Sequence, residues 1–383
     1  MRIAHLLTGL TVTASLLGSN AQGQAETRVI DPVLTDATIT PLESPSGLEA
    51  LHVAAFDPTF AEGSRPNLLV VFVPGGGAVP AQYTRFAQFA ASKGLHAIGI
   101  AYESWPSVFE LIRGKDDPDL PEAIRRERLF GESQTELIEV LPQDSITARL
   151  RSALAYLDDA YPGEGWGRYL DDDGNLRWRT IVVAGHSQGA GHSAYLTKAF
   201  TLAGSIMFAG PGDFITGAGP APWLFEPSQT PASRMFAFTH VQDPTAAGFF
   251  ANQRILGLEA FGDIESVDRK RADQLSSHML TSLIRVDHGN YHSAVVADDF
   301  LPETVAGENI YEPAWSYLLD EQIERSLGCR ADIDADGALT LFDFLAFQNA
   351  FAMGEPGADF DGDGRLTLFD FLAFQNAFSQ GCS

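Results

Sequence analysis

Residues 180–191 read TIVVAGHSQGAG, an apolar run that leads directly into a glycine-serine motif. Its first half is a continuous apolar run, which is typical of a strand buried on both faces of a parallel sheet. Its second half places Gly-x-Ser-x-Gly around Ser187, with a further glycine at 191 and a helix predicted from there to Phe200. A tight turn from strand to helix requires strained backbone at the serine and space beside it, which the glycines provide. The context therefore predicts that Ser187 is a nucleophile held above the sheet.

On both sides of this stretch, apolar runs alternate with segments of helical periodicity. One helix is predicted to begin at Asp144-Ser145, because a capping pair there precedes apolar residues at helical spacing. Such alternation predicts an α/β fold, a mostly parallel sheet wrapped by helices, over residues 28–325. The further strands are predicted at LLVVFVP (68–74), HAIGIAY (96–102), SIMFAG (205–210), RMFAFTH (234–240) and TSLIRV (281–286).

The chain has 383 residues, with 50 acidic against 25 basic side chains and a net charge of −25. This charge argues against a nucleic-acid partner and against docking on an anionic membrane surface. Arg2, the apolar stretch 6–17 and Ala21-Gln22-Gly23 predict a signal peptide over residues 1–23, and hence an exported protein. The stretch is too short to span a bilayer, and no other segment approaches that length, so no transmembrane segment is predicted.

GHSQGAG, together with the glycine loop at 74–77, resembles secreted bacterial α/β-hydrolases of the esterase and lipase kind, over about residues 65–320. The resemblance implies a nucleophile, an acid and a histidine in that chain order, each after a successive strand. The loop Pro74-Gly75-Gly76-Gly77 resembles the HGGG loop of esterases, with proline in place of histidine. It implies an oxyanion hole formed by the backbone N–H groups of Gly76 and Gln188.

The acid is expected after the strand RMFAFTH, where Asp243 stands in HVQDPTA; Asp213 in GPGDF is the competing candidate. The histidine is expected beyond the last strand, where residues 287–293 read DHGNYHS and offer His292, which we favour, or His288. The other histidines, including His186 inside the motif and His192, are interpreted as packing or polar-support residues.

These residues imply a serine hydrolase that cleaves carboxylic esters through an acyl-enzyme, with no cofactor needed for catalysis. The same triad also suits an acyltransferase or a peptidase, and a non-catalytic hydrolase-like binding protein is the alternative from a different class. Trp105 and Pro106 are candidates to line the substrate pocket. Residues 211–231, with Trp223 and Phe225, are a candidate rim, and residues 103–143 are interpreted as an irregular insertion that forms a second candidate lid.

A repeat occupies the C-terminal residues 328–383. ADIDADGALTLFDFLAFQNAF at 331–351 is nearly duplicated as ADFDGDGRLTLFDFLAFQNAF at 358–378, an offset of 27 residues. Each copy opens with Asp-x-Asp-x-Asp-Gly, and oxygen ligands at loop positions 1, 3, 5, 7, 9 and 12 are typical of calcium loops. The predicted ligands are Asp332, Asp334, Asp336, Ala338, Thr340 and Asp343 in the first copy, and Asp359, Asp361, Asp363, Arg365, Thr367 and Asp370 in the second.

Aspartate at position 12, and a helix only after each loop, resemble dockerin repeats. The resemblance implies a cohesin-like or cell-surface scaffold partner, and with the signal peptide it predicts an extracellular or surface-associated protein. Cys329 and Cys382 bracket the repeats, and in an exported protein they are predicted to form a disulfide. The phenylalanines of the two helices are expected to form the core of the small module, with an exposed remainder available to a partner.

Overall fold

The structure is a computed structural model that describes residues 25–60, 66–215, 217, 219–327, 331, 333, 339–354, 358, 360 and 365–380. The predicted signal peptide (1–23), both cysteines and most of the predicted calcium ligands lie outside these residues. Among the described residues, no helix combines the length and the apolar character that crossing a membrane demands.

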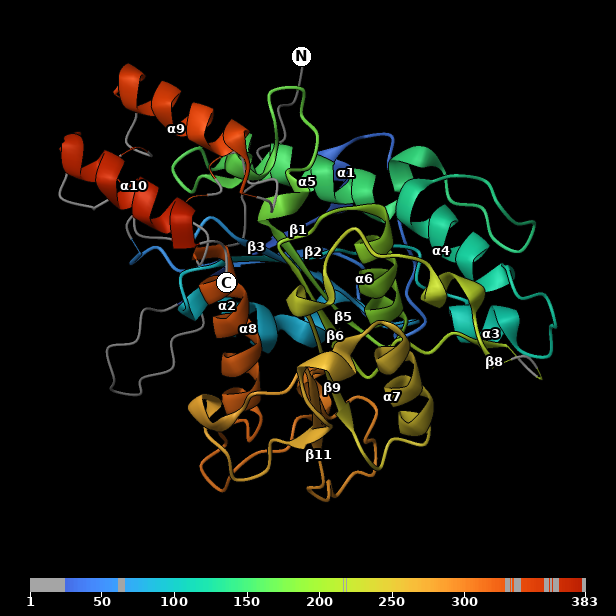
Figure 1. Ribbon diagram of the computed structural model, residues 1–383. Coiled ribbons are helices and arrows are strands. Elements are labelled where there is room, and N and C mark those ends of the chain that lie inside the picture. Colours follow the sequence, from blue (N-terminus) through green and yellow to red (C-terminus); the bar gives the residue numbers. More distant parts are fainter. Residues whose placement is uncertain are drawn as a thin grey trace, which may run out of the picture.

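A nine-stranded sheet forms the centre of the main domain (Figure 1). β1 and β2 join it antiparallel, and every other pairing in the sheet is parallel. The prediction of a mostly parallel sheet is therefore confirmed. In spatial order the strands are β1 (Glu26–Ile30), β2 (His52–Phe56), β4 (His96–Gly99), β3 (Leu69–Val73), β5 (Ile181–His186), β6 (Gly204–Phe208), β9 (Met235–His240), β11 (Met279–Ser282) and β10 (Glu265–Ser266).

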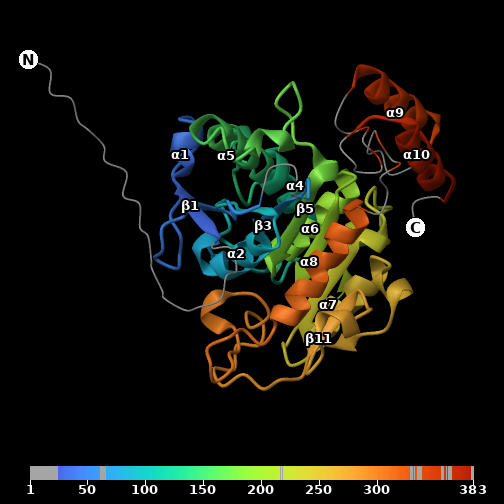
Figure 2. The same cartoon turned by 90° about the vertical axis from the view of Figure 1, so that its left-hand side faces the viewer.

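Alternate side chains of each central strand enter two separate cores, one on each face of the sheet. Leu69, Val71 and Val73 of β3 pack with α5 (Ile146–Ala160) and α6 (Gln188–Ala199). Val70 and Phe72 pack with α2 (Thr84–Ser92) and α8 (Glu312–Leu327). In Figure 1, α2 and α8 lie on one side of the strands and α6 on the other, and Figure 2 turns α8 to the front. Burial on both faces explains why these strands are continuous apolar runs.

The last predicted strand is displaced. β11 spans Met279–Ser282 rather than 281–286, because it pairs residue by residue with Ala237–His240 of β9. Leu283, directly after it, is 62% exposed, and its N–H donates to the carboxylate of Asp268. The apolar residues of 283–286 therefore belong to a loop.

Residues 103–143 are not irregular, which corrects the sequence interpretation. They contain α3 (Val108–Ile112) and α4 (Leu120–Phe130), and apolar side chains of both helices form a small core of their own. The charged composition hid α4, because Arg125, Glu127 and Arg128 point inward and are buried.

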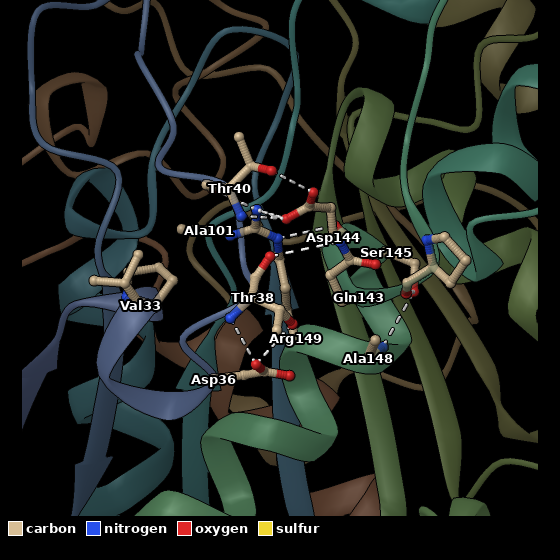
Figure 3. Close-up of polar contacts among 12 residues, drawn as sticks. Val33, Asp36, Thr38, Thr40, Ala101, Gln143, Asp144, Ser145, Ala148 and Arg149 are labelled. Carbon is tan, nitrogen blue, oxygen red and sulfur yellow. Dashed lines mark hydrogen bonds and ion pairs between the residues drawn. The ribbon is translucent and has the colours of Figure 1, made fainter.

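The start of α5 fastens the N-terminal segment to the domain (Figure 3). Ser145 is its N-cap, as predicted, and accepts the N–H of Ala148 at 3.3 Å. The neighbouring Asp144 accepts the N–H and the hydroxyl of Thr40 at 2.8 and 2.7 Å and pairs with Arg149 at 2.7 Å. Arg149 also donates to the Thr40 carbonyl, so a buried ion pair holds a segment distant in sequence.

The C-terminal repeats form α9 (Leu341–Met353) and α10 (Leu368–Gln380), drawn in red in Figure 1. Equivalent phenylalanines from the two copies meet: Phe347 stacks on Phe374 with ring centroids 4.1 Å apart, and Phe344 packs edge-on against Phe371. The duplicated phenylalanines thus supply a shared aromatic core.

Candidate active site

Ser187 lies at the turn between β5 and α6. Its backbone adopts φ 55° and ψ −112°, a conformation that L-residues rarely occupy and that must be held by its surroundings. A Cβ at Gly185 would collide with the backbone of Gly189, and a Cβ at Gly189 would collide with the Val73 carbonyl. Both motif glycines are therefore required by the close approach of backbone to backbone.

His292 and Asp243 lie side by side at the same end of the sheet. Their Nδ1 and Oδ2 atoms are 2.6 Å apart, and Asp243 also accepts the N–H and hydroxyl of Thr245 at 2.8 and 2.6 Å. Burial alone would raise the pKa of the Asp243 carboxyl, but the hydrogen bond and charge of His292, with the bonds from Thr245, lower that pKa below its ordinary value. An ionised Asp243 accepts the Nδ1 proton and leaves Nε2 of His292 as a base.

The histidine loop returns to the nucleophile turn. The His292 ring centroid is 4.9 Å from that of His186, the residue directly before Ser187. The His292 carbonyl also accepts a hydrogen bond from Nε2 of His186 at 3.0 Å. Three segments that are far apart in sequence thus meet where β5 and β9 end.

The two competing candidates have other partners. Asp213 forms a bidentate ion pair with Arg125 at 2.6 and 2.5 Å and accepts the Trp223 indole N–H at 2.9 Å. His288 is exposed and its Nε2 lies 2.9 Å from the Phe300 carbonyl. The structure therefore places His292 beside Asp243 and next to the turn that carries Ser187, whereas Asp213 and His288 have other partners.

The glycine loop after β3 offers one backbone donor. Gly75 donates its N–H to the Tyr83 hydroxyl and Gly77 donates to the Ser104 carbonyl, both at 3.3 Å. Within the described residues the N–H groups of Gly76 and Gln188 have no acceptor. Gln188 is the first residue of α6, so its N–H belongs to a helix N-terminus that favours negative charge.

The Gln188 side chain holds the segment after β4 in place. Its oxygen accepts from the Val108 N–H at 2.7 Å and from Arg128 at 2.8 Å. Its amide group donates to the Tyr102 hydroxyl at 2.8 Å and to the Ser104 carbonyl at 3.1 Å. Four hydrogen bonds fully occupy this amide and fix the residue after the nucleophile.

Two buried arginines behind this residue were not predicted from the sequence. Arg125 donates to the Gln188 carbonyl at 3.1 Å, besides its pair with Asp213. Arg128 is buried beside Gln188 and also donates to the Pro106 carbonyl; burial lowers its pKa to about 10. No motif marks either residue, because both belong to a charged segment of ordinary composition.

Aromatic side chains near the site differ in exposure. Trp105 is 42% exposed, and its ring would lie 3.2 Å from a Cβ at Gly77, so it flanks the glycine loop. Trp223 is fully buried against Tyr195, which makes it a packing residue rather than part of a rim, whereas Phe225 is exposed.

In the C-terminal module, Asp343 and Asp370, the predicted position-12 ligands, are fully buried. Asp343 accepts the Thr340 N–H at 2.8 Å, and Asp370 accepts the N–H groups of Phe360 and Thr367 at 2.7 and 2.6 Å. Carboxylate oxygens are hard donors, the kind of ligand that calcium prefers in proteins. The predicted ligands outside the described residues are Asp332, Asp334, Asp336, Ala338, Asp359, Asp361 and Asp363.

The chain matches no known family model and no curated protein. Among solved structures it is similar to Thermogutta terrifontis esterase 2 phosphoramylated by tabun (14% identity, TM-score 0.32, 62% of this chain and 81% of that one). It is also similar to a phosphonate-inhibited esterase B from Lactobacillus rhamnosis (10% identity, TM-score 0.38, 88% of this chain and 90% of that one). A third similar structure is that of a putative dienelactone hydrolase from Klebsiella pneumoniae (12% identity, TM-score 0.38, 78% of this chain and 98% of that one). All three TM-scores lie below 0.5.

Proposed function

We propose that this chain is a serine hydrolase that cleaves carboxylic ester bonds through an acyl-enzyme intermediate. The observation that carries the proposal is the 2.6 Å His292–Asp243 hydrogen bond at the end of the sheet where the strained turn presents Ser187. The mostly parallel sheet, with the nucleophile after β5, is consistent with the α/β-hydrolase fold.

Acylation follows from the roles that the geometry allows. His292 accepts the Ser187 proton at Nε2 as Oγ attacks the acyl carbonyl, and Asp243 stabilises the imidazolium. The tetrahedral oxyanion accepts hydrogen bonds from the N–H groups of Gly76 and Gln188. Each such donor typically lowers the barrier by about 3 kcal/mol.

His292 then donates this proton to the leaving alcohol, which completes acylation. In deacylation His292 removes a proton from the water that attacks the acyl-enzyme, and returns it to Oγ of Ser187 as the carboxylic acid leaves. Regenerated Ser187 closes the cycle, and every step uses side chains and backbone groups of this chain.

Hydrolysis of p-nitrophenyl acetate and butyrate by the purified full chain and by Ser187→Ala tests the proposal. We expect wild-type turnover, loss of at least about 10³-fold in the variant, and a fluorophosphonate adduct on Ser187 only in the wild type. A folded wild type that neither hydrolyses the esters nor accepts the adduct refutes the enzyme and favours a non-catalytic binding protein.

For the C-terminal repeats we propose a calcium-binding dockerin-like module that anchors the exported enzyme to a cohesin-like or surface scaffold. The buried Asp343 and Asp370 support it, since each would add one oxygen ligand to a loop of aspartates. The predicted Cys329–Cys382 disulfide would join the ends of this module.

Calorimetry with calcium on the full chain tests the module. Asp343→Asn and Asp370→Asn should each remove one of two binding events, and Asp273→Asn, an exposed aspartate of the main domain, is the matched control. Equal calcium binding by the wild type and the double variant would contradict the proposal.

A further inference from the structure

His186, the residue between Gly185 and Ser187, uses both of its ring nitrogens. Nδ1 lies 2.9 Å from the Tyr83 hydroxyl, and Nε2 lies 3.0 Å from the His292 carbonyl oxygen. Because a carbonyl only accepts, Nε2 carries the proton and Nδ1 accepts from Tyr83. Burial, and then the charge of His292, lowers the pKa of His186 to about 3, so the ring stays neutral at neutral pH.

Tyr83 continues the same network toward the glycine loop. It ends a 3₁₀ turn (Pro80–Tyr83), is buried, and its ring lies 4.5 Å from that of Phe72. Its oxygen accepts the Gly75 N–H at 3.3 Å while its own proton goes to His186. The three hydrogen bonds therefore run in one direction: Gly75 donates to Tyr83, Tyr83 donates to His186, and His186 donates to the carbonyl of His292.

The three segments that this network joins are those that carry the proposed chemistry. Gly75 precedes the oxyanion donor Gly76, His186 precedes Ser187, and the last acceptor is the backbone of His292. The loop with His292 consists of turns after β11, and the His292 side chain is 31% exposed, so hydrogen bonds contribute to its position beside packing.

We propose that His186 is a positioning residue that aligns His292 with Ser187 by anchoring the backbone of the histidine loop. Asp243 holds the ring at Nδ1, and His186 holds the main chain of the same residue. Together, the Asp243 bond to the ring and the His186 bond to the main chain define the direction of Nε2. With the Asp243 bond alone, the ring would be free to rotate about that bond. This inference rests on the hydrolase function proposed above.

The test compares His186→Phe with His186→Gln. Phenylalanine keeps a ring of similar size but neither bond, whereas glutamine can accept from Tyr83 and donate to the His292 carbonyl. We expect His186→Phe to lower kcat by about 10- to 100-fold with KM within about two-fold, because a small misplacement of a catalytic group slows the chemical step. His186→Gln should regain most of that loss, and Tyr83→Phe should fall between the two.

A second readout needs no substrate. The proton in the short His292–Asp243 hydrogen bond should give a far-downfield proton NMR resonance, assigned by its loss in His292→Ala. We expect His186→Phe to broaden or remove this resonance, and His186→Gln to retain it. Asp273→Asn, which changes an exposed aspartate paired with Arg271 outside the histidine loop, is the control and should leave rate and resonance unchanged.

The positioning role is overturned if folded His186→Phe keeps wild-type kcat and the resonance, or if His186→Gln is as impaired as His186→Phe at equal melting temperature. Should His186→Phe not fold, Tyr83→Phe and His186→Gln decide by the same criteria. If the wild type is inactive on esters but the resonance still depends on His186, the hydrolase proposal fails and the positioning contact stands.

Discussion

The loops after β6 and β9, two neighbouring strands of the sheet, each carry one buried aspartate. Asp213, after β6, is held in a bidentate ion pair by the guanidinium of Arg125. Asp243, after β9, is held against His292, an imidazole, the side chain that most often serves as a general acid or base in catalysis. The first arrangement fastens α4 to the sheet, and the second suits proton transfer. The partner, and not the position after a strand, decides what each carboxylate does.

The largest expected effect is the loss of catalytic activity when Asp243, rather than Asp213, is changed. Asp243→Asn should lower kcat by about 10⁴-fold, because the amide no longer holds His292 in the tautomer that leaves Nε2 as a base. Circular dichroism and thermal melting should change little. Steady-state ester hydrolysis measures the loss, and less than about a ten-fold decrease would contradict the role of Asp243.

For stability, we expect the larger loss when Asp213 is changed. Asp213→Ala leaves Arg125 buried without its counter-charge, and breaking such a pair typically costs about 3–5 kcal/mol of unfolding free energy. Urea denaturation measures this loss. The double change Asp213→Leu with Arg125→Met removes both charges and should cost less than the single change. If the unfolding free energy of Asp213→Ala lies within about 1 kcal/mol of the wild-type value, the Asp213–Arg125 ion pair does not hold α4 in place.

A smaller effect on stability concerns buried histidines that form no ion pair with a carboxylate. Burial lowers the pKa of His52 and His186 to about 3 and that of His278 to about 4, from 6.5. The unfolded chain therefore binds protons below pH 6.5 that the folded chain does not. Stability is fully present above pH 6.5 and is lost as pH falls toward 4 and below.

From pH 7.5 to 5.5 we expect each of these histidines to lower the unfolding free energy by about 1 kcal/mol. Asp298 opposes them, because burial raises its pKa to about 6 and the folded state then binds its proton first. Urea midpoints across this range measure the balance, with His278→Gln as a variant that should flatten the slope. A stability that is constant or rises as the pH falls would contradict this account.

The sequence predicted the parts of the site that depend on local pattern. The turn at Ser187 is visible because motif, apolar strand and helix are contiguous, and the strands β3, β4, β5, β6 and β9 are visible because both faces are buried. The capping pair at the start of α5 is equally local. These features need no knowledge of residues far along the chain.

The remaining features depend on contacts between distant residues. Asp213 and Asp243 both follow apolar runs, so their local sequences look alike. What sets Asp213 apart is its ion pair with Arg125, which is 88 residues away in the chain. The network through Tyr83 and His186 is hidden because Tyr83 reads as one more apolar residue of a helical segment. Likewise the end of β11 is set by pairing with β9, which its own apolar residues do not encode.

The most direct test of the central claim is labelling by a fluorophosphonate, followed by mass spectrometry of the modified peptide. We predict one adduct, on Ser187, formed rapidly in the wild type and in His288→Gln, and at least about 10²-fold more slowly in Asp243→Asn and His292→Ala. An intact, folded protein without an adduct on Ser187, or one labelled as rapidly without Asp243 and His292, would contradict the account.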